Sequence, residues 1–263
     1  MLHESQRSLI RGMSNYCFYI THRCQERRFL LKFEIDRKNY VKRLREAVQK
    51  YSVDILDFVV TSNHVHLLLW TEDGEAVSRM MQYVQGTTGR DFNFRKEREG
   101  SFWRGRYHPT LIQNGEHLRR CLFYIDLNMV RAKAVIHPRE WRCCGYHELC
   151  GVRERYRILN RDRLLTCLGA PCDGEGFTSW YNQTLNEKLS RGYHVREPLW
   201  SECVAVGDRD WITGHARRLA GINKEIVSYV PPRELGEDQK SYGLKVGKRA
   251  GQRLAAYLES NRA

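Results

Sequence analysis

The sequence predicts an α+β fold, in which a sheet of antiparallel strands forms a split β-α-β unit with its helices on one side. Two observations lead to this prediction. Short runs rich in aromatic and β-branched residues alternate with longer segments in which apolar residues recur at helical spacing. Up to about position 151, these segments follow one another in the order β-α-β-β-α-β-α.

The first half of this unit is a strand, a helix and a hairpin. Residues 16–21 read Tyr-Cys-Phe-Tyr-Ile-Thr, a composition typical of a strand, and apolar residues recur at helical spacing over 36–51. A strand at 53–60 is joined to one at 64–70 by the short polar turn 61–63. The strand at 64–70 is therefore held in a hairpin.

The second half adds two helices around a fourth strand. A helical pattern covers 75–98, a strand follows at 107–113, and the last helix begins near Gly115 and ends before Pro138. In that last helix an apolar stripe is formed by Leu118, Leu122, Ile125 and Met129.

A change of composition near position 152 predicts two regions, 1–151 and 152–263. The second should be a mainly helical extension, with helices expected at 160–168, 178–191, 210–220 and 248–259. It is a candidate DNA-binding region, because basic residues cluster near its end; an exposed charged helix face would give the same pattern. The basic residues are Arg217, Arg218, Lys240, Lys245, Lys248 and Arg249.

The charge of the chain favours a polyanionic partner. Its 263 residues include 44 Lys and Arg against 31 Asp and Glu, which gives a formal net charge of +13. Nucleic acid is the common partner of so basic a protein, and a solvated basic surface is the alternative. A membrane partner is not expected, because no polybasic amphipathic segment is evident.

Cysteine usage and hydropathy predict a cytoplasmic protein. The nine cysteines are odd in number and include no C-x-x-C pair, which is typical of reduced thiols. No run of eighteen uncharged apolar residues occurs, so neither secretion nor a membrane span is expected.

A His-x-His pair is the first candidate site. Because side chains alternate along a strand, His64 and His66 share one face while Val65, Leu67 and Leu69 occupy the other. Two imidazoles on one face can bind one metal ion, although many strand histidines only form hydrogen bonds.

Tyr124 and Asn128 form the second candidate site. They are four residues apart, so on a helix both point the same way, and the amide oxygen of Asn128 is a competent metal ligand. One helix could then supply a metal ligand and a nucleophile, which suggests phosphoryl transfer. The alternative is that Tyr124 is a core aromatic beside the apolar stripe.

Three motifs together resemble the single-tyrosine HUH transposases, most closely the REP-associated tyrosine transposases. They are Asn63-His64-Val65-His66-Leu67-Leu68, Phe102-Trp103-Arg104-Gly105-Arg106-Tyr107, and the segment 123–132 that carries Tyr124 and Asn128. The resemblance covers about residues 12–151. One departure is Met129, where the family commonly has proline, a residue that would affect the helix rather than the chemistry.

The resemblance implies a ferredoxin-like domain, a divalent ion and a covalent mechanism. The ion, Mg²⁺ or Mn²⁺, would be held by His64, His66 and Asn128. Tyr124 would cleave single-stranded DNA through a 5′-phosphotyrosine intermediate, and rejoining would make the protein a strand transferase. The implied substrate is hairpin DNA of the repetitive extragenic palindromic (REP) type. The sequence leaves open whether the protein is a monomer or a homodimer.

Basic residues near these motifs are candidate DNA contacts. Trp103, Arg104 and Arg106 would offer a stacking surface beside two cations, and Arg131 and Lys133 extend the positive charge from the tyrosine helix. Structural salt bridges are the alternative role for these residues.

Two other functions remain open at this point. One is a rolling-circle initiator or relaxase with the same histidine and tyrosine chemistry. The other is a non-catalytic protein that only binds hairpin DNA or RNA.

Overall fold

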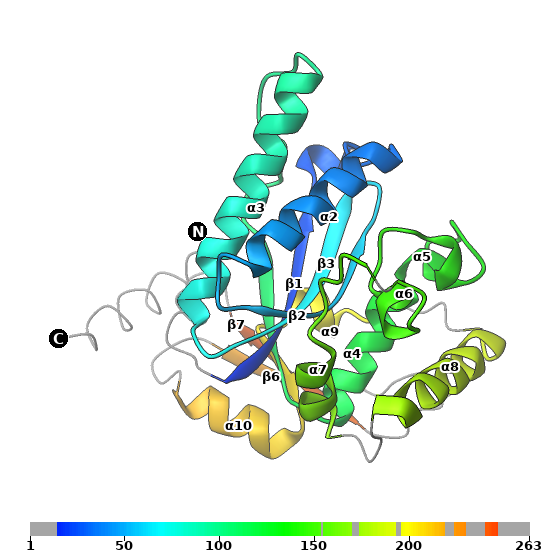
Figure 1. Ribbon diagram of the computed structural model, residues 1–263. Helices are drawn as coiled ribbons and strands as arrows, with labels where there is room; N and C mark the ends of the chain where they lie inside the picture. Colours follow the sequence, from blue (N-terminus) through cyan, green and yellow to red (C-terminus); the bar gives the residue numbers. More distant parts are fainter. Residues whose placement is uncertain are drawn as a thin grey trace.

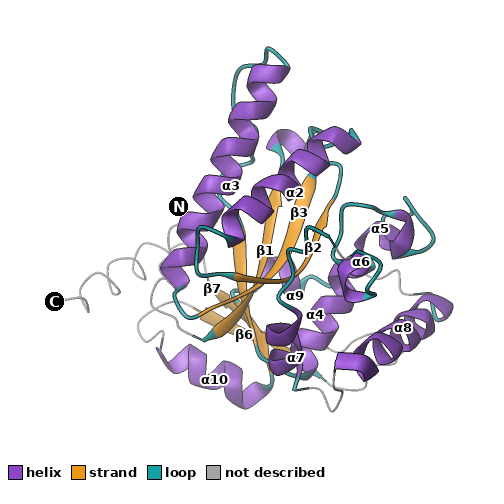
Figure 2. Ribbon diagram, in the orientation of Figure 1, coloured by secondary structure: helices purple, strands orange, loops and turns teal. Residues whose placement is uncertain are grey.

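The computed structural model describes residues 15–153, 155–169, 174–192, 196–218, 224–229 and 240–246. These residues contain a sheet in the order β2-β3-β1-β4-β5-β7-β6 (Figures 1 and 2). Its strands are β1 (Tyr16–Arg23), β2 (Asp54–Val60), β3 (His64–Thr71), β4 (His108–Ile112), β5 (Ala205–Gly207), β6 (Lys224–Tyr229) and β7 (Ser241–Val246).

The longer helices surround this sheet, and shorter turns of helix lie in the connections. The longer helices are α2 (Glu34–Val48), α3 (Gly74–Arg95), α4 (Glu116–Asp126), α7 (Arg161–Leu168), α8 (Gly174–Ser190) and α10 (Arg209–Arg218). The short ones are η1 (Gln25–Arg27), α5 (Asn128–Arg131), η2 (Pro138–Glu140), α6 (Tyr146–Leu149) and α9 (Leu199–Glu202).

The predicted α+β class and the split β-α-β unit are confirmed. The first four strands have the order β2-β3-β1-β4, and every pairing among them is antiparallel. The sequence order of the elements through α4 is the predicted one. In the register of β1 against β3, Arg23 lies opposite His64, which brings the end of β1 to the predicted metal-binding strand.

The prediction that the helices lie on one side of the sheet is wrong. Helices α2 and α3 cover one face, where Val65, Leu67 and Leu69 join their core. Helix α4 covers the opposite face, and its buried residues pack with Leu68 and Trp70. The alternation that turns the histidines away from α2 and α3 therefore places them on the side of the tyrosine helix.

The region after position 152 is also less helical than predicted. Helices α7, α8 and α10 match expected ones, but β5, β6 and β7 extend the sheet, and β5 pairs with β4 in parallel. A β4-to-β5 pairing means that the sheet crosses the expected boundary near 152. The expected helix at 248–259 lies outside the described residues. Among the described helices, none has the length and apolar character that a membrane span needs.

A short segment after η2 closes the β2 side of the sheet. Val60 N–H donates to the Cys143 carbonyl, and Gly145 N–H donates to the Phe58 carbonyl at 2.8 Å. Position 145 accepts only glycine, because a Cβ there would collide with the buried carboxyl group of Asp57. Burial raises the pKa of Asp57 well above its usual value, and the nearby Asp126 carboxyl raises it further.

We predict that Asp57→Asn stabilises the protein at alkaline pH. An unfolded Asp ionises near about pH 4, whereas folded Asp57 keeps its proton to higher pH, so the parent loses stability as pH rises through that interval. The amide of the variant cannot ionise, so this loss does not occur. Urea denaturation should show a free energy of unfolding that is higher than the parent's by roughly 1–3 kcal/mol at pH 8 and by less at pH 4. Glu99→Gln, at an exposed site, is the control. A gain that is the same at both pH values would contradict the assignment.

Candidate active site

The two histidines lie at the start of β3, directly after the turn that joins it to β2. His66 is buried and His64 is half-buried, and their ring centroids are 4.7 Å apart. The turn is closed by Thr61, whose N–H donates to the His64 carbonyl and whose hydroxyl donates to the same oxygen. The sequence prediction that the two imidazoles share a face agrees with this geometry.

Hydrogen bonds fix which nitrogen of each imidazole carries the proton. The side-chain amide oxygen of Asn63 (Oδ1), which can only accept, lies 2.6 Å from His64 Nδ1, so Nδ1 is the donor there. Asn128 Nδ2 lies 2.9 Å from His66 Nε2 and donates to it. His66 Nδ1 then donates to the Tyr19 hydroxyl oxygen at 2.5 Å. Nε2 is therefore the unprotonated nitrogen of each ring, and that of His66 accepts from Asn128 in this arrangement.

Both histidines are neutral at physiological pH. Burial, together with the nearby guanidinium groups of Arg23 and Arg131, lowers the pKa of His64 to about 3. Burial also lowers the pKa of His66 well below its usual value, and the neighbouring His64 and Arg131 act in the same direction. Neutral imidazole is the form that binds a metal ion.

His64, His66 and Asn128 fit a divalent cation. Rotating the Asn128 amide by half a turn exchanges its nitrogen for its oxygen, so a carbonyl oxygen then faces the point at which His66 Nε2 is directed. The described part of the chain contains no group of three or more His, Cys, Asp or Glu arranged to hold a metal. Asn128 is thus a candidate for a third protein ligand beside the two imidazoles.

Tyr124 lies near the end of α4, one aromatic ring away from the histidines. Its ring centroid is 6.3 Å from that of Tyr19, and the Tyr19 ring stacks on His66 at 5.6 Å. Trp200, from α9, contacts the Tyr124 ring at 5.9 Å. The Tyr124 side chain is buried, but its hydroxyl makes no hydrogen bond within the described residues. The side chain is therefore held by its ring contacts.

The helix that carries Tyr124 is interrupted before Asn128. Helix α4 ends at Asp126, Leu127 has φ −79° and ψ 6°, and α5 begins at Asn128. The interruption occurs although the chain has Met129 rather than proline at the next position. Tyr124 and Asn128 therefore reach the same site from two short helices, and not from one continuous helix as the sequence predicts.

Arg131 holds the tyrosine in place. Its guanidinium lies 3.8 Å from the centre of the Tyr124 ring, and its Nη2 donates to the Tyr124 carbonyl at 2.7 Å. Burial raises the pKa of the Tyr124 phenol, and Arg131 acts in the opposite direction. The phenol is thus protonated at neutral pH, with a cation beside it that favours the phenolate.

The C-terminal region also contributes to the site. One turn before Tyr124, the buried guanidinium of Arg120 forms an ion pair with buried Glu197 and donates to Ser241 Oγ at 2.7 Å. Because both partners lie after position 152, they connect α4 to the extension of the sheet. Breaking such a buried pair leaves an uncompensated charge.

Two arginines near the site did not stand out in the sequence. Arg23 faces His64 across β1 and β3. Burial lowers the pKa of Arg23, and the nearby guanidinium of Arg196 lowers it further. Only the pairing register reveals Arg23, since forty residues separate it from His64. These cations, with Arg131, surround the site with positive charge suited to a phosphate.

The predicted DNA contacts divide into buried and exposed residues. Trp103 is buried, its N–H donates to the Gln85 carbonyl, and its ring stacks on His22 at 4.3 Å, so the expected base-stacking role does not fit its position. A tryptophan beside two arginines looks the same in sequence whether it packs inward or outward. Arg104, Arg106 and Lys133 are exposed.

Exposed aromatic rings occur elsewhere, in the segment before α2 and near the end of α3. Phe29, Phe33 and Phe94 are all largely exposed, and Lys96 lies 5.5 Å from the centre of the Phe33 ring. The sequence pattern around these rings indicates no role for them. Their neighbour Leu31 donates its N–H to the Ser62 carbonyl in the turn before His64.

Comparisons with known proteins show that the candidate site lies in a segment that matches a protein family. Residues 13–128 match the family described as "Transposase IS200 like", and this segment contains Tyr124, His64, His66 and Asn128. The predicted resemblance to such transposases is therefore confirmed for this part of the chain. No curated protein gives a match.

One solved structure among the similar ones is that of a REP-associated tyrosine transposase bound to a REP hairpin. It is 18% identical, with a TM-score of 0.46, and the similarity covers 56% of this chain and 85% of that one.

We predict that Tyr19→Phe weakens metal binding without unfolding the site. Loss of the hydroxyl that orients His66 should reduce Mn²⁺ affinity by roughly 10–100-fold, measured by titration calorimetry. Tyr40→Phe is a matched control, because Tyr40 is also buried and its hydroxyl has no hydrogen-bond partner among the described residues. Equal Mn²⁺ affinity in the two variants would show that Tyr19 does not support the ligand.

Proposed function

Because residues 13–128 match the IS200-like transposases, we propose that this protein is a metal-dependent nuclease and strand transferase for single-stranded DNA. The substrate we propose is hairpin DNA of the REP type, as the motif resemblance implies, and Tyr124 is the nucleophile. The observation that carries the proposal is the position of Tyr124, whose ring contacts Tyr19 while the Tyr19 hydroxyl holds His66.

The reaction is an exchange of one phosphoester for another. The Tyr124 oxygen attacks phosphorus and forms a Tyr–O–P bond to the 5′ phosphate of the strand downstream of the break, while the bond from phosphorus to the 3′ oxygen of the upstream strand breaks. The phenolic proton is lost and the 3′ oxygen gains one, so a free 3′ hydroxyl results. A second 3′ hydroxyl can reverse the step and join strands, since the phosphotyrosine bond retains the ester's energy.

The residues around Tyr124 have separate roles in this reaction. Arg131 fixes the ring and favours loss of the phenolic proton. Arg23 and Arg196 add positive charge where a phosphate would approach, which offsets the charge that develops in the transition state. A divalent cation held by His64, His66 and Asn128 would supply Lewis-acid activation and orientation of the phosphate when bound.

The assembly of the site within one chain supports action in cis. Tyr124, Tyr19, His66 and Asn128 are linked by ring contacts and hydrogen bonds inside the same molecule. We therefore propose that a monomer is active, and that a homodimer, if it forms, does not exchange the tyrosine helix.

We predict that Tyr124→Phe abolishes a covalent protein–DNA adduct and retains DNA binding. The parent protein, incubated with Mn²⁺ and labelled hairpin oligonucleotides that carry single-stranded flanks, should give a band that resists denaturation. The variant should give none, because its ring keeps the contacts but lacks the attacking oxygen. Tyr51→Phe is the control.

Each outcome of this experiment decides between functions. An adduct that persists in Tyr124→Phe would identify a different nucleophile. No adduct in the parent, with binding intact, would favour the non-catalytic hairpin binder. A rolling-circle initiator or relaxase would form the adduct without preference for the hairpin.

We predict that mixing two inactive variants does not restore activity. Tyr124→Phe and His66→Gln each remove one half of the site, so a cis enzyme stays inactive in the mixture, whereas exchanged helices would rebuild one intact site per mixed dimer. The adduct assay after joint refolding measures this. An adduct in the mixture would show that the tyrosine acts in trans.

A further inference from the structure

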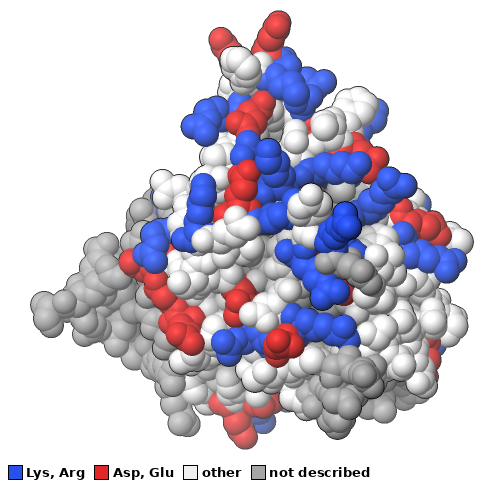
Figure 3. Space-filling view, in the orientation of Figure 1, with Lys and Arg blue, Asp and Glu red and all other residues white. Residues whose placement is uncertain are grey.

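A basic groove lies between α2 and the segment 142–156, apart from the residues assigned to the active site. It has a volume of about 580 Å³. Its described lining contains six cationic side chains and no carboxylate; they are Lys38, Lys42, Arg45, Arg142, Arg153 and Arg155. In Figure 3, Lys and Arg side chains gather over α2 and next to it on this face of the molecule.

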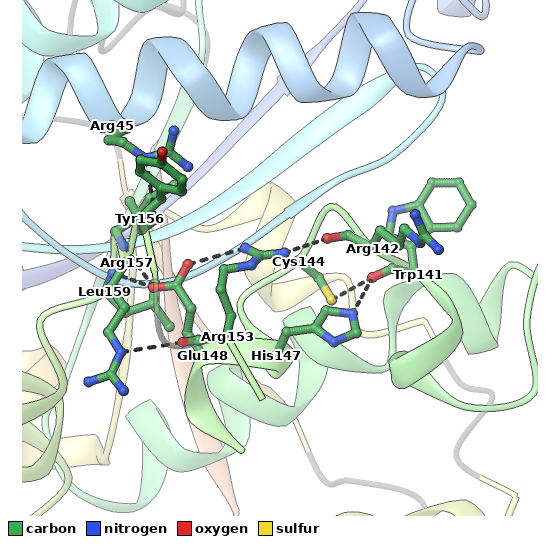
Figure 4. A network of polar contacts seen from close by, with 11 residues as sticks. Arg45, Trp141, Arg142, Cys144, His147, Glu148, Arg153, Tyr156, Arg157 and Leu159 are labelled. Carbon is green, nitrogen blue, oxygen red and sulfur yellow. Dashed lines mark hydrogen bonds and ion pairs between the residues drawn. The ribbon is translucent and has the colours of Figure 1, made fainter. Parts of the chain in front are cut away.

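A buried carboxylate gives the far wall of the groove its shape (Figure 4). Glu148 Oε2 accepts the N–H groups of Ile158 and Leu159, at 2.7 and 2.9 Å. Its Oε1 accepts from Arg153 Nη1, and Arg153 Nη2 donates to the Arg142 carbonyl at 2.8 Å. These hydrogen bonds fix the shape of the wall, and Arg153 has a structural role in it.

The remaining cations have little compensation. Lys38 lies 3.0 Å from Glu34, and Arg142 lies 3.9 Å from the same exposed carboxylate. Lys42 and Arg155 take part in no ion pair within the described residues. Like charges that face one groove repel each other, so an anionic occupant would be favoured.

Tyr156 provides an aromatic surface at this groove. Tyr156 is 73% exposed, and its backbone has φ 59°, a left-handed conformation that is uncommon for a large residue. The Arg45 guanidinium lies 4.9 Å from the ring centre, and Arg45 Nε donates to the Tyr156 carbonyl at 3.2 Å. One cation therefore steadies a ring that remains open to solvent.

We propose that this groove binds an unpaired stretch of DNA, whose phosphates contact Lys42, Arg142 and Arg155 and one of whose bases stacks on Tyr156. A groove of phosphate-binding cations with an exposed aromatic ring suits single strands, because only an unpaired base offers its face. The inference goes beyond the proposed chemistry at Tyr124, since binding here requires no cleavage.

The test compares two charge reversals in the full-length protein. Lys42→Glu with Arg155→Glu alters the groove, and Arg90→Glu with Arg209→Glu makes the same change of charge at exposed positions on α3 and α10. All variants also carry Tyr124→Phe, so binding is measured without covalent capture. The anisotropy of a labelled single-stranded oligonucleotide gives Kd at several salt concentrations, and thermal melting confirms folding.

The groove variant should bind at least about 10-fold more weakly than the control pair at moderate salt. The slope of log K against log salt should fall in magnitude by about 1.4, which corresponds to two lost phosphate contacts on a single strand. Tyr156→Ala should weaken binding of the single strand by about 10-fold and leave binding of a blunt duplex unchanged.

Several results would overturn the inference. Equal affinity in the groove variant and the control pair would show that the groove holds no DNA. An unchanged affinity in Tyr156→Ala would show that no base stacks on Tyr156. An equal loss of duplex and single-strand binding would assign the groove to a paired stem instead. Adduct formation at saturating DNA, measured with Tyr124 restored, should persist in the groove variant, so failure at Tyr124 and failure at the groove give different results.

Discussion

The site depends on the two hydrogen bonds of one buried imidazole. His66 donates to Tyr19 on one side and accepts from Asn128 on the other, so a residue from β1 and a residue from α5 fix its ring in the centre of the molecule. The same Tyr19 ring touches Tyr124. An imidazole held from both sides loses little freedom when it binds a ligand, which is the physical advantage of arranging a site before its ligand arrives.

Local pattern was sufficient for much of this arrangement. The alternation of β3 predicts the shared face of His64 and His66, and apolar spacing predicts α2, α3 and α4. Contacts between distant segments were not predictable, because they depend on strand register and packing. Arg23 enters the site only through its pairing with β3, and β5 is three residues long, too short for a clear alternation. Trp103 was misjudged since composition does not reveal which way a ring points.

The interrupted helix relates backbone geometry to chemistry. Where α4 ends, the carbonyl of Tyr124 accepts from the Arg131 side chain, and the same guanidinium covers the ring of that tyrosine. One arginine thus satisfies a backbone group at a helix end and positions the side chain that we propose as nucleophile. Arg120, one turn earlier, anchors the other side of α4 to Glu197. Two arginines therefore hold α4, one from its middle and one near its C-terminal end.

The parallel pairing of β5 with β4 affects how copies of this chain can meet. In a four-stranded split β-α-β sheet, β4 would be an outer strand with unpaired N–H and C=O groups, available for another molecule to continue the sheet. Here β5 occupies that position, and on the opposite side β2 has isolated bridges to Leu159 and Cys144. Both ends of the original unit are therefore protected against edge-to-edge association and the aggregation that follows from it.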